Sequence, residues 1–232
     1  MEFSPEGPKA IPLWVNGRAF LTVTESFFDV VNPHSGEAVH RVPLCGAAEA
    51  AEAAGAARAA QPAWAALAPE ARQACLDALA DGLDRYTGHF VKLLRGDTGF
   101  PEAQAQDEVA AALAALRGTV VGEAGVVALV VDATRPLAGF AEAAASILRA
   151  GGAVIVKPSP KAPAAAFALC ELSGRAAWPP GVLNLMQGDT EAIDGLCCGG
   201  IDRLVYAGNA ALGVQVGAIA DAAGKPYVML AS

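Results

Sequence analysis

Two segments of the sequence carry the residue types that hold phosphate-bearing ligands. Lys157 comes directly after the β-branched run AVIV at 153–156, and the glycine-rich stretch AGNAALG occupies residues 207–213. The first follows a predicted strand, and the second lies between a predicted strand and a predicted helix. Parallel strands end at a common edge of their sheet, and such sheets bind ligands there, often with a phosphate at a helix N-terminus. We therefore expect both segments to face the edge where a dinucleotide would lie.

The same residues also have a purely structural interpretation. Lys157 could be an ordinary exposed lysine at a strand end, Asn209 a helix N-cap of the preferred type, and Gly208 a turn requirement. The sequence leaves the binding and the structural interpretation open.

The cysteines offer little further chemistry. No paired metal-ligand spacing occurs among them, the three histidines do not join them, and we predict no metal site. We interpret them as reduced thiols, several buried as small hydrophobic residues. The adjacent pair at 197–198 has no neighbouring base and enters the predicted strand at 202–206 from the side opposite the ligand edge, which is poor support for a nucleophile. The five are Cys45, Cys75, Cys170, Cys197 and Cys198.

Charge and hydropathy exclude two classes of partner. The 232 residues carry a formal net charge of −8 and no basic run, which opposes nucleic-acid binding. No stretch approaches the roughly 18 apolar residues of a membrane span. The start, MEFSPEGPKA, lacks the basic-then-apolar order of a signal peptide. We expect a cytoplasmic protein without membrane or nucleic-acid partners.

The second half of the chain alternates short β-branched runs with helical stretches, which is typical of a parallel sheet wrapped by helices. The pattern predicts an α/β fold, a Rossmann-like doubly wound parallel sheet with helices on both faces. The predicted strands are 125–131, 153–156, 182–186, 202–206 and 227–230. The predicted helices between them are 138–150, 162–177, 190–197 and 210–222.

The first half supplies an N-terminal hairpin and helices. Residues 13–31 hold two β-rich runs around an Asn-Gly pair, followed by the turn signal NPHSGE. From Ala47 to about Arg117 the pattern is helical, with Pro69 and Pro101 at expected first-turn positions and Gly118 as the expected stop. We expect one domain over 1–232, with the hairpin and helices in 1–118 and the Rossmann-like core in 119–232.

Five segments, in order, resemble the NAD-binding half of the aldehyde dehydrogenase superfamily. They are WVNGRAF…FDVVNPHSGEAV, AGGAVIVKPSPKAP, WPPGVLNLMQGD, IDRLVYAGNAALGVQV and KPYVMLAS. The resemblance runs nearly end to end over that half. It implies the family's NAD-binding-domain fold without a catalytic domain or an oligomerisation flap.

The resemblance implies a partial cofactor site. Lys157 matches the family's lysine that bonds the adenosine ribose hydroxyls, but Pro160 replaces the acidic residue that shares the ribose. Asn209 replaces the hydroxyl residue that faces the pyrophosphate. We therefore expect no cofactor, with weak NAD binding as the alternative. The candidate binding residues are Lys157, Ser159, Gly188, Gly208, Asn209 and Gly213.

The catalytic residues implied by the resemblance are missing. Family members use a cysteine nucleophile, an asparagine that holds the oxyanion and a glutamate general base. Thr134 stands at the asparagine position and could donate one hydrogen bond, whereas Met229 stands at the glutamate position and can move no proton. The nucleophile would belong to a domain beyond Ser232.

A shortened connection also departs from the family pattern. Family members carry a long β excursion before the strand at Val126, and it pairs with strands near their carboxyl terminus to form the oligomerisation flap. Here only GTVVGEAG joins that strand to the helix before it. Because both halves of the flap are missing together, we interpret the chain as a remodelled module whose natural end lies near Ser232, not as a truncation.

Three functions remain open. The first is a catalytically inactive domain that acts as a structural, oligomerisation or partner-binding module, similar to the degenerate carboxyl-terminal domains of larger aldehyde dehydrogenases and bifunctional proline-utilisation flavoenzymes. A homodimer, a hetero-partner or a larger aldehyde dehydrogenase would be its partner. The second is a regulator that binds NAD or an adenine nucleotide on Lys157. The third is a dehydrogenase subunit whose catalytic cysteine comes from another chain or domain.

Overall fold

A seven-stranded sheet forms the centre of the protein in a computed structural model that describes residues 8–22, 26–176 and 178–231. Five parallel strands, all predicted, make up most of it: β6 (Val126–Val131), β7 (Ala153–Pro158), β8 (Leu183–Leu185), β9 (Arg203–Gly208) and β10 (Tyr227–Ala231). The strand order is β10-β9-β6-β7-β8-β2-β3. The predicted α/β fold with a parallel sheet is confirmed.

The order of the parallel strands reverses between β6 and β9. From β6 the chain moves one way through α5 (Ala138–Arg149) to β7 and through α6 (Ala164–Arg175) to β8. It then returns through α7 (Thr190–Cys198) to β9, on the other side of β6, and continues through α8 (Ala210–Ala222) to β10. Ligands of such sheets bind at this reversal, outside the carboxyl ends of the strands.

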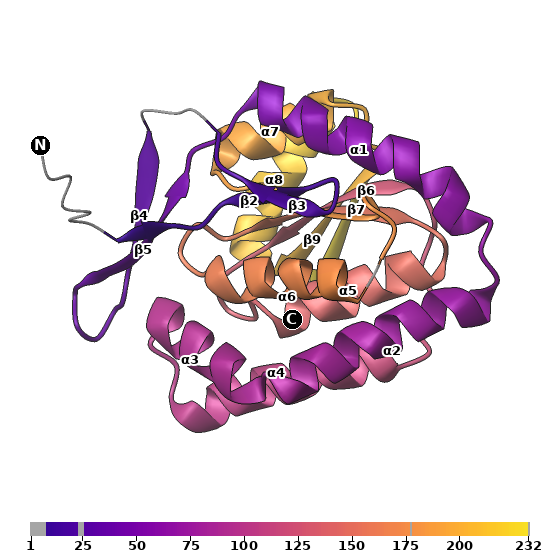
Figure 1. Ribbon diagram of the computed structural model, residues 1–232. Coiled ribbons are helices and arrows are strands. Elements are labelled where there is room, and N and C mark those ends of the chain that lie inside the picture. Colours follow the sequence, from indigo (N-terminus) through magenta and orange to yellow (C-terminus); the bar gives the residue numbers. More distant parts are fainter. Residues whose placement is uncertain (1–7, 23–25, 177, 232) are drawn as a thin grey trace, which may run out of the picture.

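Helices cover both faces of the sheet, as Figure 1 shows. The side chains of Val127, Leu129 and Val131 pack into one core with α5 and α6, whereas those of Val126 and Val130 pack into a second core with α7 and α8. Every residue of β6 is buried for this reason, and the strand has the continuous apolar run of a central parallel strand.

The Asn-Gly hairpin forms where it was predicted and joins the main sheet. Asn16 and Gly17 adopt left-handed backbone angles, φ 52° and 75°, which suit a tight turn between antiparallel strands. They connect β2 (Leu13–Val15) to β3 (Arg18–Phe20), and β2 pairs with β8.

A separate three-stranded sheet corrects the predicted extent of the hairpin. We expected residues 13–31 to form one unit, but β4 (Phe27–Val31) leaves the hairpin and pairs with β5 (Ala38–Pro43). The short β1 (Lys9–Ala10) completes this sheet in the order β1-β5-β4, beside the main body in Figure 1. Val30 and Val42 are buried in its own small core, which explains why β4 prefers this partner.

Four helices fill the predicted helical region. Proline at the first position of α2 (Pro69–Arg85) confirms one predicted start, and Pro101 lies one residue outside the expected first turn, as the N-cap of α4 (Glu102–Arg117). Gly118 caps the end of α4 as predicted. The helix α1 (Ala47–Ala65) packs against α7, and α2 and α4 pack against α5. The sequence did not single out α3 (Thr87–Thr98).

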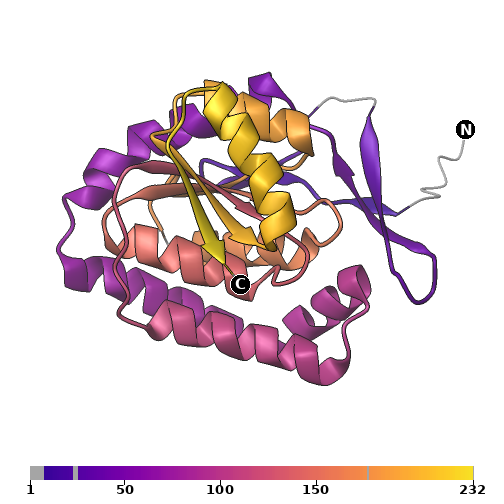
Figure 2. The ribbon, with the colours of Figure 1, turned by 180° about the vertical axis from the view of Figure 1, so that it is seen from behind.

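Residues 118–125 lead directly from α4 to β6 without a helix or strand, so the short connection expected from GTVVGEAG is present. Figure 2 shows this side of the molecule, with α8 and β10 at the front. Val120 and Val121 in this connection are 72% and 64% exposed. The part of the chain that the structure describes contains no helix long and apolar enough to cross a bilayer.

Candidate functional site

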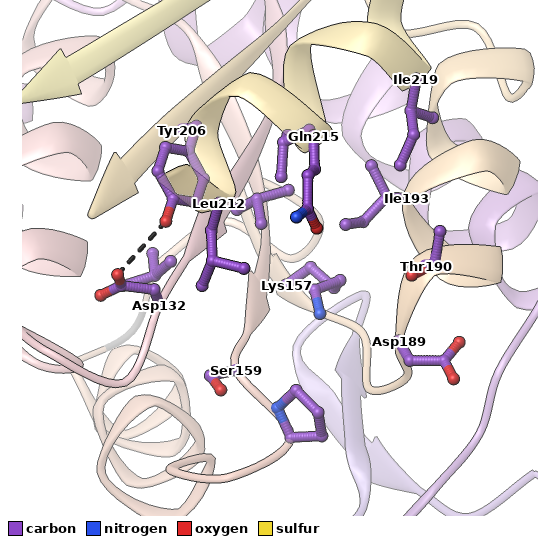
Figure 3. A pocket seen from close by; sticks show the side chains of 14 residues that line it. Asp132, Lys157, Ser159, Asp189, Thr190, Ile193, Tyr206, Leu212, Gln215 and Ile219 are labelled. Atoms are coloured by element: carbon purple, nitrogen blue, oxygen red, sulfur yellow. Dashed lines mark hydrogen bonds between the residues drawn. The ribbon is translucent and has the colours of Figure 1, made fainter. Parts of the chain in front are cut away.

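A cleft of about 370 Å³ opens at the carboxyl ends of β6, β7 and β9, where the strand order reverses. Side chains from three strand ends reach it: Asp132 after β6, Lys157 at the end of β7 and Tyr206 in β9. Thr190 of α7 and Gln215 of α8 lie on its walls, as Figure 3 shows. The sequence predicted a site at this edge, and the structure places the cleft there.

Lys157 is buried, so its interpretation as an ordinary exposed lysine is wrong. The residue is 4% exposed, and its Nζ donates a hydrogen bond to the carbonyl oxygen of Gly188 at 3.0 Å. Burial lowers the pKa of Lys157 to about 8, although the negative charge of Asp189 acts to raise it. Among the described residues that line the cleft, Lys157 carries the only positive charge. A desolvated ammonium in this place can donate further hydrogen bonds to a ligand.

The loops around Lys157 have a fixed geometry. Gly188 has a φ of 129°, and a Cβ there would lie 2.7 Å from the Cβ of Ala192, so the loop that presents its carbonyl oxygen to Lys157 requires glycine. Ser159 and Pro160 line the cleft on the other side, and the Ser159 hydroxyl accepts a hydrogen bond from the Lys161 backbone N–H at 3.3 Å. Ser159 therefore lies at the cleft, and its role in cofactor binding stays a prediction.

The three candidate residues at the end of β9 and the start of α8 have structural roles. Asn209 is the N-cap of α8, and its side-chain oxygen accepts from the Leu212 N–H at 3.1 Å. Gly213 lies so close to β9 and β10 that a Cβ there would lie 2.4 Å from the Met229 sulfur. Gly208 has a φ of 155°. Asn209 thus has the N-cap role, and Gly208 the turn conformation, that the structural interpretation expected. Gly213 permits close packing of the helix on the sheet.

Asp132 organises the edge beside them, although the sequence analysis did not name it. Its carboxylate accepts hydrogen bonds from the Thr134 hydroxyl at 2.5 Å, the Asn209 N–H at 2.7 Å and the Tyr206 hydroxyl at 3.2 Å. Burial opposes its ionisation, but these bonds outweigh burial and hold the pKa of Asp132 below its ordinary value. The hydroxyl of Thr134 is consequently engaged within the protein.

Met229 lies on β10 in register with Tyr206. Its side chain is 41% exposed and approaches Gly213. A thioether neither binds nor releases a proton at this position, so Met229 cannot act as a general base.

Two of the predicted residues, Lys157 and Ser159, line the cleft, and Gly188 bonds directly to Lys157. Sequence reasoning missed Asp132 and Tyr206. Asp132 follows the predicted strand 125–131 at the same edge as Lys157, and that position was the available signal.

The cysteines do not reach this cleft. Burial raises the pKa of Cys45 to about 12 and that of Cys197 to about 11, and it raises the pKa of Cys170 and Cys75 as well. Cys198 is exposed at the end of α7, on the amino-terminal side of β9. None of the described residues form a cluster that could hold a metal ion.

Comparison with known proteins assigns the family. A sequence model described as "Aldehyde dehydrogenase family" matches residues 20–124 and 119–231, two segments that meet in the short connection before β6. The chain belongs to the aldehyde dehydrogenase family.

This aldehyde dehydrogenase family member is similar to curated enzymes over about half of their length. It is 28% identical to glutarate-semialdehyde dehydrogenase of Pseudomonas putida over 228 residues, which cover 88% of this chain and 48% of the relative. It is 31% identical to N-succinylglutamate 5-semialdehyde dehydrogenase of Escherichia coli, covering 88% of this chain and 45% of the relative. Lactaldehyde dehydrogenase from Escherichia coli has the same fold, with a TM-score of 0.89, 23% identity, and 96% of this chain covering 52% of that one.

These similarities confirm the predicted family and fold. The region that matches this chain is about half of each of these relatives. The roles carried over to Lys157, Thr134 and Met229 from the family resemblance stay predictions.

Proposed function

We propose that this chain is a catalytically inactive aldehyde dehydrogenase family domain that acts as a structural or partner-binding module. The observation that carries the proposal is the position of its thiols: none of the five cysteines lines the cleft, and each of the four with a shifted pKa is shifted upward. A thiolate nucleophile requires the opposite shift and an accessible site. Met229 at the predicted general-base position supports the same conclusion.

The exposed edge of the main sheet supports a role in contact. β10 is an edge strand among the described residues, and Val228, Met229 and Leu230 are each about 40% exposed on it. Leu212 and Val214 on the neighbouring α8 are 45% and 70% exposed. An apolar edge strand of this kind favours pairing with another chain or segment.

Light scattering tests this proposal. We expect a dimer or a complex with a co-purifying protein, and we expect the double substitution Val228→Lys/Leu230→Lys to give a monomer because two charges would be desolvated in the contact. Leu67→Lys is the matched control, since Leu67 is 37% exposed in the turn between α1 and α2. If the wild type is a folded monomer at all concentrations and no partner co-purifies with it, the proposal is contradicted.

A second candidate function is nucleotide binding without chemistry, and the burial of Lys157 beside the cleft favours it. Calorimetry with NAD⁺, NADP⁺ and AMP, comparing wild type with Lys157→Met, tests this candidate. Lys161→Met is the control, because Lys161 is exposed. Absence of heat at about millimolar ligand, which corresponds to roughly 4 kcal/mol of binding free energy, would exclude a useful nucleotide site. The cytoplasmic location also stays a proposal.

A further inference from the structure

The carboxylate of Asp132 occupies the N-terminus of α8. Its Oδ2 accepts the backbone N–H of Asn209, the N-cap residue of that helix, at 2.7 Å. The Tyr206 hydroxyl donates to the same oxygen at 3.2 Å. A helix N-terminus carries a partial positive charge and unpaired N–H groups, which attract anions. Asp132 supplies that anion from within the chain.

The Asp132 carboxylate also lies directly against the backbone of Gly208. A Cβ on Gly208 would lie 2.3 Å from Asp132 Cγ, and the backbone there has a φ of 155°. A glycine before the helix of a dinucleotide-binding sheet generally lets a phosphate approach the backbone. In this chain the group that approaches the glycine backbone is the side chain of Asp132.

The charges along the cleft agree with this arrangement. Lys157 and Asp132 line different parts of the cleft, and Asp189 lies on the same side as Lys157 (Figure 3). Hydrogen bonds from Thr134 and Asn209 keep the pKa of Asp132 low, so the carboxylate is ionised at neutral pH. A diphosphate that reached α8 would meet this negative charge directly.

We propose that Asp132 is a built-in anion that excludes a phosphate or diphosphate group from the α8 end of the cleft. The residue therefore determines which ligands the cleft rejects. This inference goes beyond the proposed contact role and does not depend on it, because it concerns only anion binding by the isolated chain.

Thermal unfolding with inorganic pyrophosphate tests the inference. Asp132→Ala removes the carboxylate and vacates its space, so added pyrophosphate should bind the exposed N–H groups and raise the melting temperature. At a concentration about tenfold above the dissociation constant, the rise should be about 3–5 °C. The wild type should shift by less than about 1 °C, since its anion site is filled.

Glu49→Ala is the matched control. Glu49 also places a carboxylate at a helix N-terminus, accepting the Gly46 N–H at 3.1 Å, but it lies outside the cleft. Its loss should not create a response to pyrophosphate. Equal responses in wild type, the control and Asp132→Ala, or none in Asp132→Ala, would overturn the inference.

A second variant keeps the test decisive if Asp132→Ala does not fold. Asp132→Ser removes the charge and most of the volume of the carboxylate but keeps a hydrogen-bonding group. Calorimetry should show that it binds pyrophosphate at least about tenfold more tightly than wild type, since a facing like charge is gone. Equal affinity of the two proteins would show that Asp132 acts only as a structural cap.

Discussion

The ammonium of Lys157 lies 3.0 Å from the carbonyl oxygen of Gly188, so the cation at the end of β7 bonds to backbone and not to a carboxylate. Gly188 can present that oxygen because, without a Cβ, it adopts the φ of 129° that this loop requires. The negative charge of Asp189 offsets the effect of burial on Lys157 only in part. A buried and incompletely paired ammonium destabilises the fold while it is charged.

Replacing Lys157 by methionine should change how stability depends on pH. The pKa of Lys157 falls from 10.5 to about 8 on folding, so between these values the unfolded chain binds more protons than the folded one. Lys157 should therefore contribute a rise in stability of up to about 3 kcal/mol as the pH increases through this window. The buried thiols contribute a fall above pH about 9, so the Lys157 effect is measured as the difference in unfolding free energy between wild type and Lys157→Met. Denaturant unfolding should show Lys157→Met more stable than wild type at pH about 8 and the difference shrinking toward pH about 10.5, whereas Lys161→Met should follow wild type. A difference that is constant across the window would contradict the burial of the charged amine.

Asp97 should produce the opposite dependence in a lower pH window. It is 4% exposed, its Oδ2 accepts the Ala164 N–H at 2.9 Å, and its Oδ1 lies 3.7 Å from His40 Nε2. Burial raises the pKa of Asp97 from 3.8 to about 7, so the folded state binds more protons in between. The stability that Asp97 contributes should therefore fall as the pH rises through that window, and this contribution should be fully lost above pH about 7.

Asp97→Asn tests this expectation, because the amide keeps the bond to Ala164 without a charge. The variant should be more stable than wild type by about 1–3 kcal/mol at pH about 8, and the difference should shrink at pH about 5. Asp81→Asn, at an exposed carboxylate, is the control and should show neither effect. A variant less stable than wild type at the higher pH would count against a buried ionised Asp97.

Gly208→Ala should be strongly destabilising. The added Cβ would collide with the Asp132 carboxyl carbon, and the positive φ of 155° adds backbone strain. We expect a loss of about 2–4 kcal/mol in unfolding free energy. Gly55→Ala in α1, where a Cβ meets nothing within 4 Å, should instead stabilise the helix by about 1 kcal/mol. Similar effects of the two substitutions would show that Asp132 does not approach Gly208 this closely.

The parallel core was predictable because its strands are buried on both faces and read as continuous apolar runs. The position of Lys157 at the edge of the sheet was also predictable, because a charged residue directly after the apolar run AVIV marks the end of a buried strand. Asp132 is in the same position after β6, but its partner Asn209 is 77 residues away, and local patterning gives no sign of their contact.

The elements that were missed depend on distant partners. β5 carries His40 and Arg41 within a polar pattern, and its pairing with β4 gives it a buried face at Val42. α3 begins two residues after the end of α2 without a side-chain cap, so no local signal separates the two helices. Long-range packing decides both.

Installing a carboxylate at the predicted base position should not create an enzyme. Met229 is 41% exposed, so Met229→Glu should fold. Without a thiolate at the cleft the variant still lacks a nucleophile, and we expect no aldehyde-dependent NADH formation. Met229→Gln controls for polarity. Activity that appears only in the glutamate variant would mean that a nucleophile does lie within reach.

The proposal that the chain is inactive is tested most directly by assaying the purified polypeptide for NADH formation with semialdehyde and simple aldehyde substrates. We predict a rate equal to that of buffer, with and without thiol alkylation. Steady turnover that alkylation abolishes would contradict the proposal.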